Sequence, residues 1–189
     1  MDCTSSLLAQ AGVEDSKASV SLRAPARLHL GFLDPSASLG RRFGSLGLVI
    51  DGFETEVEIS AATRTVVVAS GAAEHGEIDR AQAWLARLQR ESGRTEPVQL
   101  RLVKVMPDHA GFGSGTQLAL AIGRAFAQWH GLGIQTARLA QWLGRGLRSG
   151  IGIAGFDQGG LLVDGGPGAN GEPAPVLSRV ALPAAWRVL

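Results

Sequence analysis

Apolar and polar residues alternate along several short stretches in the first third of the chain. In residues 54–59, threonine, valine and isoleucine alternate with glutamates, a spacing that predicts a strand with one face in water. Residues 20–23 and 27–32 are also predicted to be strands. Residues 64–69 are rich in β-branched side chains, and we interpret them as the hairpin partner of residues 54–59.

Apolar residues recur at helical spacing in the middle of the chain. They predict one helix over residues 78–88 and a second over residues 118–129. Each of these stretches is followed by a glycine, which is expected to end the helix. A third helix is predicted to begin near Thr136 and to turn Leu147 inward.

Two further strands are predicted at residues 98–102 and 159–163. Because strands come first and a strand, a glycine loop and helices follow, the order favours an α+β fold over a repeated βαβ array. The expected division of the chain is a loose arm at residues 1–17, one domain at 18–175, and a linker or the start of a truncated second domain at 176–189.

Composition and charge exclude several classes of protein. With 45% apolar and 19% charged residues, the chain of 189 residues can bury a substantial core. A net charge of +1 argues against a protein built to neutralise nucleic acid. The single cysteine, Cys3, suits a reducing cytosol, and no stretch is typical of a secretory signal or a membrane span. We therefore expect a cytoplasmic protein that acts on small molecules, with no nucleic-acid or membrane partner.

A glycine-rich loop joins the strand at residues 98–102 to the helix at 118–129. Glycines let the backbone approach a ligand, and the unpaired N–H groups at the start of a helix favour an anion. No Lys-Ser or Lys-Thr pair follows the last glycine, so this is not a Walker loop. A helix entry whose glycines serve only packing is the alternative. The candidate phosphate-binding residues are Gly111, Gly113, Ser114, Gly115 and Thr116.

Two more segments carry candidate chemistry. Arg27 and His29 lie two positions apart, so both side chains project from one face of their predicted strand. Arg148 precedes a glycine-rich stretch in which Asp157 is the charged residue. A carboxylate in such apolar surroundings is costly unless it is paired, hydrogen-bonded or bound to metal, so Asp157 is either a helix cap or a functional group. Arginine outnumbers lysine 16 to 2. Genome composition is the simpler cause, but guanidinium groups also grip phosphate or carboxylate through two hydrogen bonds.

These three segments, in this order, resemble the motifs of the GHMP kinase superfamily. Residues 25–27 match its Pro-x-Arg strand, residues 107–114 its glycine-rich helix entry, and residues 150–157 its later glycine-rich segment with an aspartate. The resemblance implies an α+β fold, a GHMP-type N-terminal domain that is ribosomal-protein-like, with helices on one face of a two-layer structure. It also implies a C-terminal ferredoxin-like domain, which we expect to be missing from these 189 residues.

One departure narrows the resemblance. This chain has Ser-Gly-Thr-Gln at residues 114–117 where the kinases have Ser-Ser-Ala-Ala, and the second serine of that motif helps to hold the nucleotide phosphates and Mg²⁺. The chain instead resembles the β-ribofuranosylaminobenzene 5'-phosphate synthases, a family on the same fold that does not use ATP. The segments that carry this second resemblance are residues 26–34, 111–117 and 148–160.

What this second resemblance implies is a glycosyltransferase of methanopterin biosynthesis and one-carbon metabolism. Such an enzyme transfers the phosphoribosyl group of phosphoribosyl pyrophosphate to 4-hydroxybenzoate or 4-aminobenzoate, with loss of pyrophosphate and CO₂. Mg²⁺ is then the expected cofactor, ATP is not expected, and the metal ligands are unknown. We expect the glycine loop to bind pyrophosphate, and Arg27, His29 or Arg148 to hold a phosphate or carboxylate. Asp157 is the expected catalytic carboxylate, because it aligns with the catalytic aspartate of the kinases.

Two other functions stay open. The chain could be an ATP-dependent sugar or alcohol kinase with Asp157 as the base, or a non-catalytic ligand-binding domain. Because GHMP-type sites close between two domains and exclude water, this domain alone is expected to be nearly inactive. A homodimer is a possible assembly.

Overall fold

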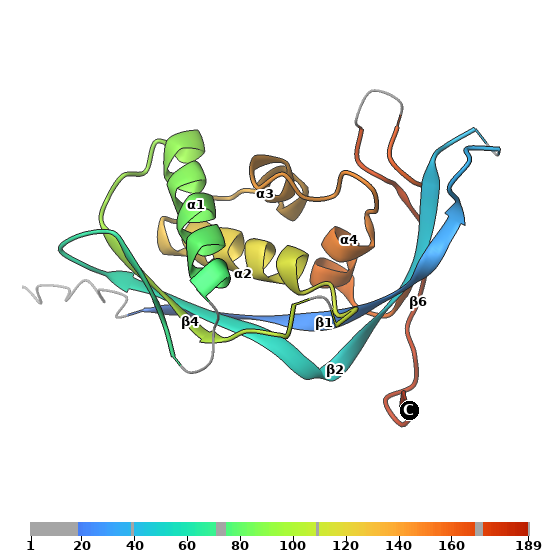
Figure 1. Ribbon diagram of the computed structural model, residues 1–189, viewed down its shortest axis with the longest axis horizontal. Coiled ribbons are helices and arrows are strands. Elements are labelled where there is room, and N and C mark those ends of the chain that lie inside the picture. Colours follow the sequence, from blue (N-terminus) through green and yellow to red (C-terminus); the bar gives the residue numbers. More distant parts are fainter. Residues whose placement is uncertain (1–18, 39, 71–74, 109, 169–171, 189) are drawn as a thin grey trace, which may run out of the picture.

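The computed structural model describes residues 19–188, apart from residues 39, 71–74, 109 and 169–171. Over these residues, the helices gather on one face of a twisted sheet (Figure 1). The predicted α+β class with helices on one face is therefore confirmed. The arm expected at residues 1–17 lies outside the described residues.

The elements follow the predicted order closely. The strands of the described chain are β1 (Val20–Asp34), β2 (Phe43–Ala61), β3 (Val66–Ala69), β4 (Val98–Lys104), β5 (Leu161–Asp164) and β6 (Val176–Val180). The helices are α1 (His75–Ser92), α2 (Ser114–Trp129), α3 (Thr136–Trp142) and α4 (Ile151–Gln158).

The long strand β2 organises the sheet. Along one edge it pairs antiparallel with β1, from Val20 opposite Ile59 to Asp34 opposite Phe43. Along the other edge it pairs antiparallel with β4 through residues 56–61 and with β5 through residues 45–48. The last residues of β4 and the first residues of β5 therefore point toward each other across the middle of β2. This topology brings the glycine loop, which follows β4, close to α4, which precedes β5.

One predicted pairing is wrong. Residues 64–69 were expected to form a hairpin with residues 54–59, but β3 instead pairs parallel with β4. Both edges of β2 at residues 56–59 are already occupied, by β1 and β4. β3 consequently adds to the outer edge of β4, and the connection through α1 makes β3, α1 and β4 a βαβ unit.

The main core lies between α2 and the sheet. As the apolar spacing predicts, Leu118, Ile122 and Phe126 of α2 are almost fully buried, and α2 packs on both β1 and β2. α1 and α3 pack against α2 in turn. Leu147, which was expected to face inward, is 74% exposed, because α3 ends at Trp142 and the chain has left the helix before Leu147.

The segment that contains Asp157 is helical, which the sequence did not predict. Glycines within a helix cost conformational entropy, so the run of glycines from residue 150 gives no local signal for a helix. In α4 they allow close packing instead. A Cβ atom on Gly152 would lie 2.8 Å from Cγ2 of Thr116, and one on Gly155 would lie 2.8 Å from Cγ2 of Val49. α4 therefore packs directly against α2 and β2.

The sheet continues past residue 175, the expected domain boundary. β6 pairs antiparallel with β5, with Val180 opposite Leu161, and every residue of β6 is exposed. Hydrogen bonding thus makes residues 176–180 part of this sheet. Within the described residues, no helix is long and apolar enough to cross a membrane.

Candidate functional site

Arg27 ties β1 to the glycine loop. Its backbone N–H donates to the carbonyl of Phe112 at 3.0 Å, and its guanidinium lies against Gly113. A Cβ atom on Gly113 would stand 2.7 Å from one terminal nitrogen of Arg27 and 2.8 Å from Nε. Gly113 is the N-cap residue of α2 with φ 65°, so both its conformation and this contact require glycine. The first turn of α2 therefore begins directly beside a guanidinium.

The Arg27 side chain is buried without full hydrogen bonding. The residue is 9% exposed, and its Nε has no hydrogen-bond partner among the described residues. Burial lowers the pKa of Arg27, and the negative charge of Asp164 partly offsets this effect. Since arginine stays charged in proteins, a cation is held in low-dielectric surroundings. An anionic ligand would complete its coordination.

Asp164 is a residue that the sequence reasoning missed. It is fully buried and accepts hydrogen bonds from Ser149 Oγ at 2.9 Å and from the backbone N–H groups of Gly150 at 2.8 Å and Ile151 at 3.2 Å. The N–H of Gly166 donates to its other oxygen at 2.9 Å. Asp164 thus caps the start of α4 and anchors the loop that carries Arg148. An aspartate at the end of a predicted strand, followed by two glycines, was the available signal.

His29 lies on the same side of β1 as Arg27. Burial is the main cause that lowers the pKa of His29; the positive charge of Arg27 adds to this effect and Asp164 opposes it. The imidazole is therefore neutral near pH 7. Its Nε2 has no hydrogen-bond partner among the described residues, and the ring meets Phe32 edge-on at 4.6 Å between centroids. His29 is suited to hydrogen bonding with a ligand rather than to acting as a cation.

A cavity of about 440 Å³, which we call the arginine cavity, is lined by four of the nine candidate residues. Arg148 contributes from the exposed loop before α4. Thr116 also lines it, with its methyl group against Gly152. The residues that define the arginine cavity are Arg27, His29, Thr116, Arg145, Arg148 and Gly152.

The remaining loop residues have different surroundings. The Ser114 hydroxyl donates to Asp108 at 2.8 Å, so it does not point freely toward the arginine cavity. A Cβ atom on Gly111 would have no neighbour within 4 Å, although its φ is 81°. Gly115 lies under two guanidinium groups, from Arg145 and Arg80. Arg145, which lines the arginine cavity, is a second residue that the sequence reasoning missed.

Asp157 lies elsewhere. Gly152 and Asp157 are five positions apart on α4, which at 3.6 residues per turn separates them by roughly 140° around the helix. Asp157 lines a different cavity of about 570 Å³, which we call the Asp157 cavity. There its Oδ1 accepts a hydrogen bond from the Thr136 hydroxyl at 2.6 Å. The structure thus does not bring Asp157 to the glycine loop, where a catalytic role was expected to place it.

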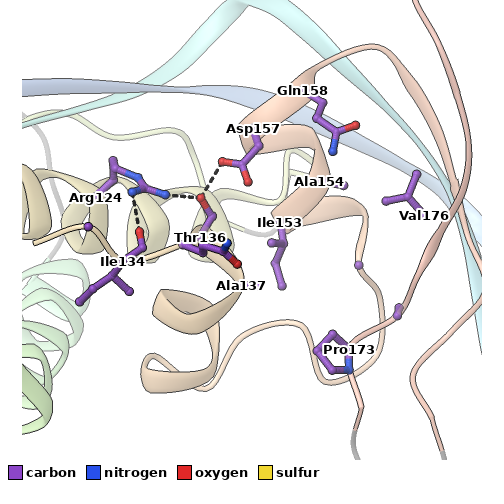
Figure 2. Close-up of a pocket in the computed structure, with 14 residues that line it drawn as sticks. Arg124, Ile134, Thr136, Ala137, Ile153, Ala154, Asp157, Gln158, Pro173 and Val176 are labelled. Carbon is purple, nitrogen blue, oxygen red and sulfur yellow. Dashed lines mark hydrogen bonds between the residues drawn. The ribbon is translucent and has the colours of Figure 1, made fainter.

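Charged and polar side chains of the Asp157 cavity are joined in a chain of hydrogen bonds. Arg124 donates to the carbonyl of Ile134 at 2.7 Å and to the hydroxyl of Thr136, which in turn donates to Asp157. Figure 2 shows this chain, with Arg124, Thr136 and Asp157 pointing toward one another from α2, α3 and α4. The polar groups satisfy each other and link three helices.

The carboxylates near the arginine cavity do not form a magnesium cage. Within the described residues, no group of three or more histidine, cysteine, aspartate or glutamate side chains could hold a metal ion. Asp164 is occupied by hydroxyl and N–H donors, and Asp108 pairs with Arg80 at 2.8 Å. Mg²⁺ is often held instead by one or two carboxylates together with the phosphates of a substrate.

Comparison with known proteins adds sequence relatives. A family model described as the GHMP kinases N terminal domain matches residues 79–160. The chain is 36% identical over 180 residues to β-ribofuranosylphenol 5'-phosphate synthase of Archaeoglobus fulgidus, covering 89% of this chain and 55% of that protein. It is 30% identical over 187 residues to the protein of the same name from Methanothermobacter thermautotrophicus, covering 89% and 56%. The chain thus spans about half the length of the curated relatives that it matches.

Solved structures support the fold. Homoserine kinase from Cytophaga hutchinsonii superposes with a TM-score of 0.59 at 20% identity, over 91% of this chain and 54% of the kinase. Mevalonate kinase from methicillin-resistant Staphylococcus aureus superposes with a TM-score of 0.61 at 17% identity, over 88% of this chain and 57% of the kinase.

Proposed function

We propose, from the premise that this chain contains a GHMP kinase N-terminal domain, that its arginine cavity binds phosphoribosyl pyrophosphate for transfer of the phosphoribosyl group to an aromatic acid. The observation that carries the proposal is the guanidinium of Arg27, buried beside the first turn of α2 with an unpartnered Nε. A buried cation at a helix start favours a phosphorylated ligand. The reaction class comes from the relatives named β-ribofuranosylphenol 5'-phosphate synthase.

The acceptor in this proposal is 4-hydroxybenzoate, with 4-aminobenzoate as the second candidate. The relatives' name describes a ribosylated phenol, which 4-hydroxybenzoate would yield. The ring carbon that bears the carboxylate attacks C1 of the ribose, and the bond from C1 to pyrophosphate breaks. CO₂ then leaves, and its bonding electron pair returns to the ring. The product would serve methanopterin biosynthesis.

The residues have separate tasks in such a reaction. The departing pyrophosphate gains negative charge, which guanidinium groups and helix N–H groups stabilise. The loop from Gly111 to Thr116 therefore meets the pyrophosphate, with Arg27 beside it. Arg148, which is exposed at the rim, holds the 5'-phosphate or the aromatic carboxylate. The neutral imidazole of His29 forms a hydrogen bond with a substrate hydroxyl. Mg²⁺ remains a prediction, and none of these steps depends on a metal held by the protein.

The experiment incubates the 189-residue chain with phosphoribosyl pyrophosphate and 4-hydroxybenzoate and measures pyrophosphate release. The Archaeoglobus fulgidus relative serves as positive control. A parallel reaction with ATP and small alcohols measures ADP, the product that a kinase would form. Calorimetry with phosphoribosyl pyrophosphate measures binding, which we expect even where turnover is low. ADP formation, or no binding of phosphoribosyl pyrophosphate, would contradict the proposal.

A further inference from the structure

A second pair of arginines covers the start of α2. Arg80 comes from α1 and Arg145 from the loop after α3. At the position of a Cβ atom on Gly115, one terminal nitrogen of Arg145 would lie at 3.4 Å and one of Arg80 at 3.7 Å. Two guanidinium groups from distant parts of the chain thus lie close to the first turn of α2.

The charges in this cluster do not balance. Arg80 pairs with Asp108 at 2.8 Å, and Ser114 also donates to Asp108. No described carboxylate lies within ion-pair distance of Arg145. Burial and the nearby positive charge of Arg80 lower the pKa of Arg145, while Asp108 opposes this. Two like charges in partly buried surroundings repel each other unless an anion joins them.

Other contacts hold Arg145 in place without neutralising it. Its guanidinium lies over the ring of Trp84 at 5.6 Å, and its backbone N–H donates to the carbonyl of Ala140 at 2.8 Å. A cation fixed in this way loses little further freedom when it binds a ligand. The side chain also lines the arginine cavity together with Arg27 and Thr116. Arg145 is therefore positioned in advance for a ligand in that cavity.

The first turn of α2 is flanked by cations on two sides. Arg27 approaches at Gly113, and it is the buried side chain with an unpartnered nitrogen aimed at this helix start. Arg145 and Arg80 approach at Gly115, two residues along. A diphosphate presents two phosphate groups, so it can contact Arg27 on one side of the turn and Arg145 on the other.

We propose that Arg145 binds the pyrophosphate group of the substrate directly, that Arg80 assists it, and that Asp108 is a positioning residue that holds Arg80. This inference rests on the proposed function and deepens it by assigning the diphosphate end of the substrate to the Gly115 side of the loop. In this assignment the guanidinium groups of Arg145 and Arg80 neutralise the negative charge of the diphosphate.

The test uses two probes, inorganic pyrophosphate and ribose 5-phosphate, and measures their dissociation constants for the 189-residue chain by calorimetry. We expect Arg145→Gln to weaken pyrophosphate binding by about 10- to 100-fold, the scale of a lost charge-assisted hydrogen bond, and to leave ribose 5-phosphate within about twofold. Arg145→Lys should be intermediate, because an ammonium lacks the guanidinium fork. Arg80→Gln should weaken pyrophosphate binding by a smaller factor.

The matched control is Arg101→Gln, which removes a half-exposed arginine on β4 that pairs loosely with Glu58 at 3.9 Å. It should change neither constant. The inference is wrong, while the proposed function stands, if Arg145→Gln binds pyrophosphate with wild-type affinity. The same holds if this variant loses affinity for both probes by the same factor. If the wild type binds neither probe, both fail. Should Arg145→Gln not fold, wild-type pyrophosphate affinity in both Arg145→Lys and Arg80→Gln would overturn the inference.

Discussion

The two cavities on either side of α4 contain similar polar groups. In one cavity these groups bond to each other, and in the other some of them lack hydrogen-bond partners. In the Asp157 cavity, the guanidinium of Arg124, the hydroxyl of Thr136 and the carboxylate of Asp157 are joined in one hydrogen-bonded chain. In the arginine cavity, Nε of Arg27 and Nε2 of His29 have no partner among the described residues. Buried polar groups are usually satisfied, so unsatisfied ones indicate a place where a ligand completes the bonding.

Size alone would have selected the other cavity. The Asp157 cavity measures about 570 Å³ and the arginine cavity about 440 Å³. The larger one is lined mostly by apolar and small residues around polar groups that already bond to each other (Figure 2). Unpaired charge distinguishes a binding site from a structural junction here better than volume does.

The largest expected effect comes from replacing one arginine of each cavity, Arg27 or Arg124, in separate variants. Arg27→Met should weaken binding of phosphoribosyl pyrophosphate by roughly 10- to 100-fold, since a charge-assisted contact is lost, without lowering stability, because a poorly satisfied buried cation is removed. Arg124→Met should do the reverse, lowering the free energy of unfolding by about 1–3 kcal/mol as Thr136 and Ile134 lose their partner. Calorimetry and urea unfolding measure the two quantities. Equal loss of binding in both variants would erase the distinction between the cavities.

A glycine pair tests the contact between Arg27 and the loop. Gly113→Ala should weaken binding of phosphoribosyl pyrophosphate by about tenfold, because its Cβ would displace the Arg27 guanidinium from 2.7 Å, and a misplaced binding group costs on this scale. Gly131→Ala is the control, since Gly131 follows the other end of α2 and has the same φ of 65° but open space around it. Both variants should lose similar stability. If they bind equally, the loop does not act through Arg27.

Asp157→Asn should have a smaller effect, and on stability rather than on binding. The amide keeps the size of the side chain but weakens the hydrogen bond from Thr136, at a cost of about 1 kcal/mol in the free energy of unfolding. Thr136→Val should cost at least as much, and Thr136→Ser should be nearly neutral because it keeps the hydroxyl. Affinity for phosphoribosyl pyrophosphate should stay within twofold in all three. A large loss of affinity in Asp157→Asn would instead indicate that Asp157 contacts the ligand, as the sequence motif implied.

The smallest expected effect is a pH dependence from His29. The folded protein lowers the pKa of His29, so the unfolded chain, where histidine titrates near pH 6.5, takes up the proton more readily. The stability from neutral His29 is complete above about pH 6.5 and decreases as the pH falls below that value. The difference in unfolding free energy between wild type and His29→Asn should therefore fall between pH 7.5 and pH 5. His130, whose pKa is also lowered, is present in both proteins and cancels. A difference that grows in acid would mean that Asp164 stabilises protonated His29.

Local pattern was sufficient for most elements and for part of the site. Period-two and helical spacing predicted strands within β1 to β5 and three of the helices, but neither the first half of β2 nor β6. The sequence also predicted that Arg27 and His29 share a strand face and that a glycine loop begins a helix. Arg27, His29, Thr116 and Arg148 line one cavity, which follows from the order of the three motifs and from the topology around β2.

Tertiary structure decided the rest, since it depends on contacts between distant segments. β3 pairs with β4 because the edges of β2 are filled by strands from other parts of the chain. α4 forms because its glycines fit against Thr116 and Val49, a gain that no local propensity contains. The orientation of α4 about its own axis then directs Asp157 away from the glycine loop. The placement of Arg80 and Arg145 beside that loop, and of Asp164 at the start of α4, likewise follows from packing, because residues so far apart in sequence share no local spacing pattern.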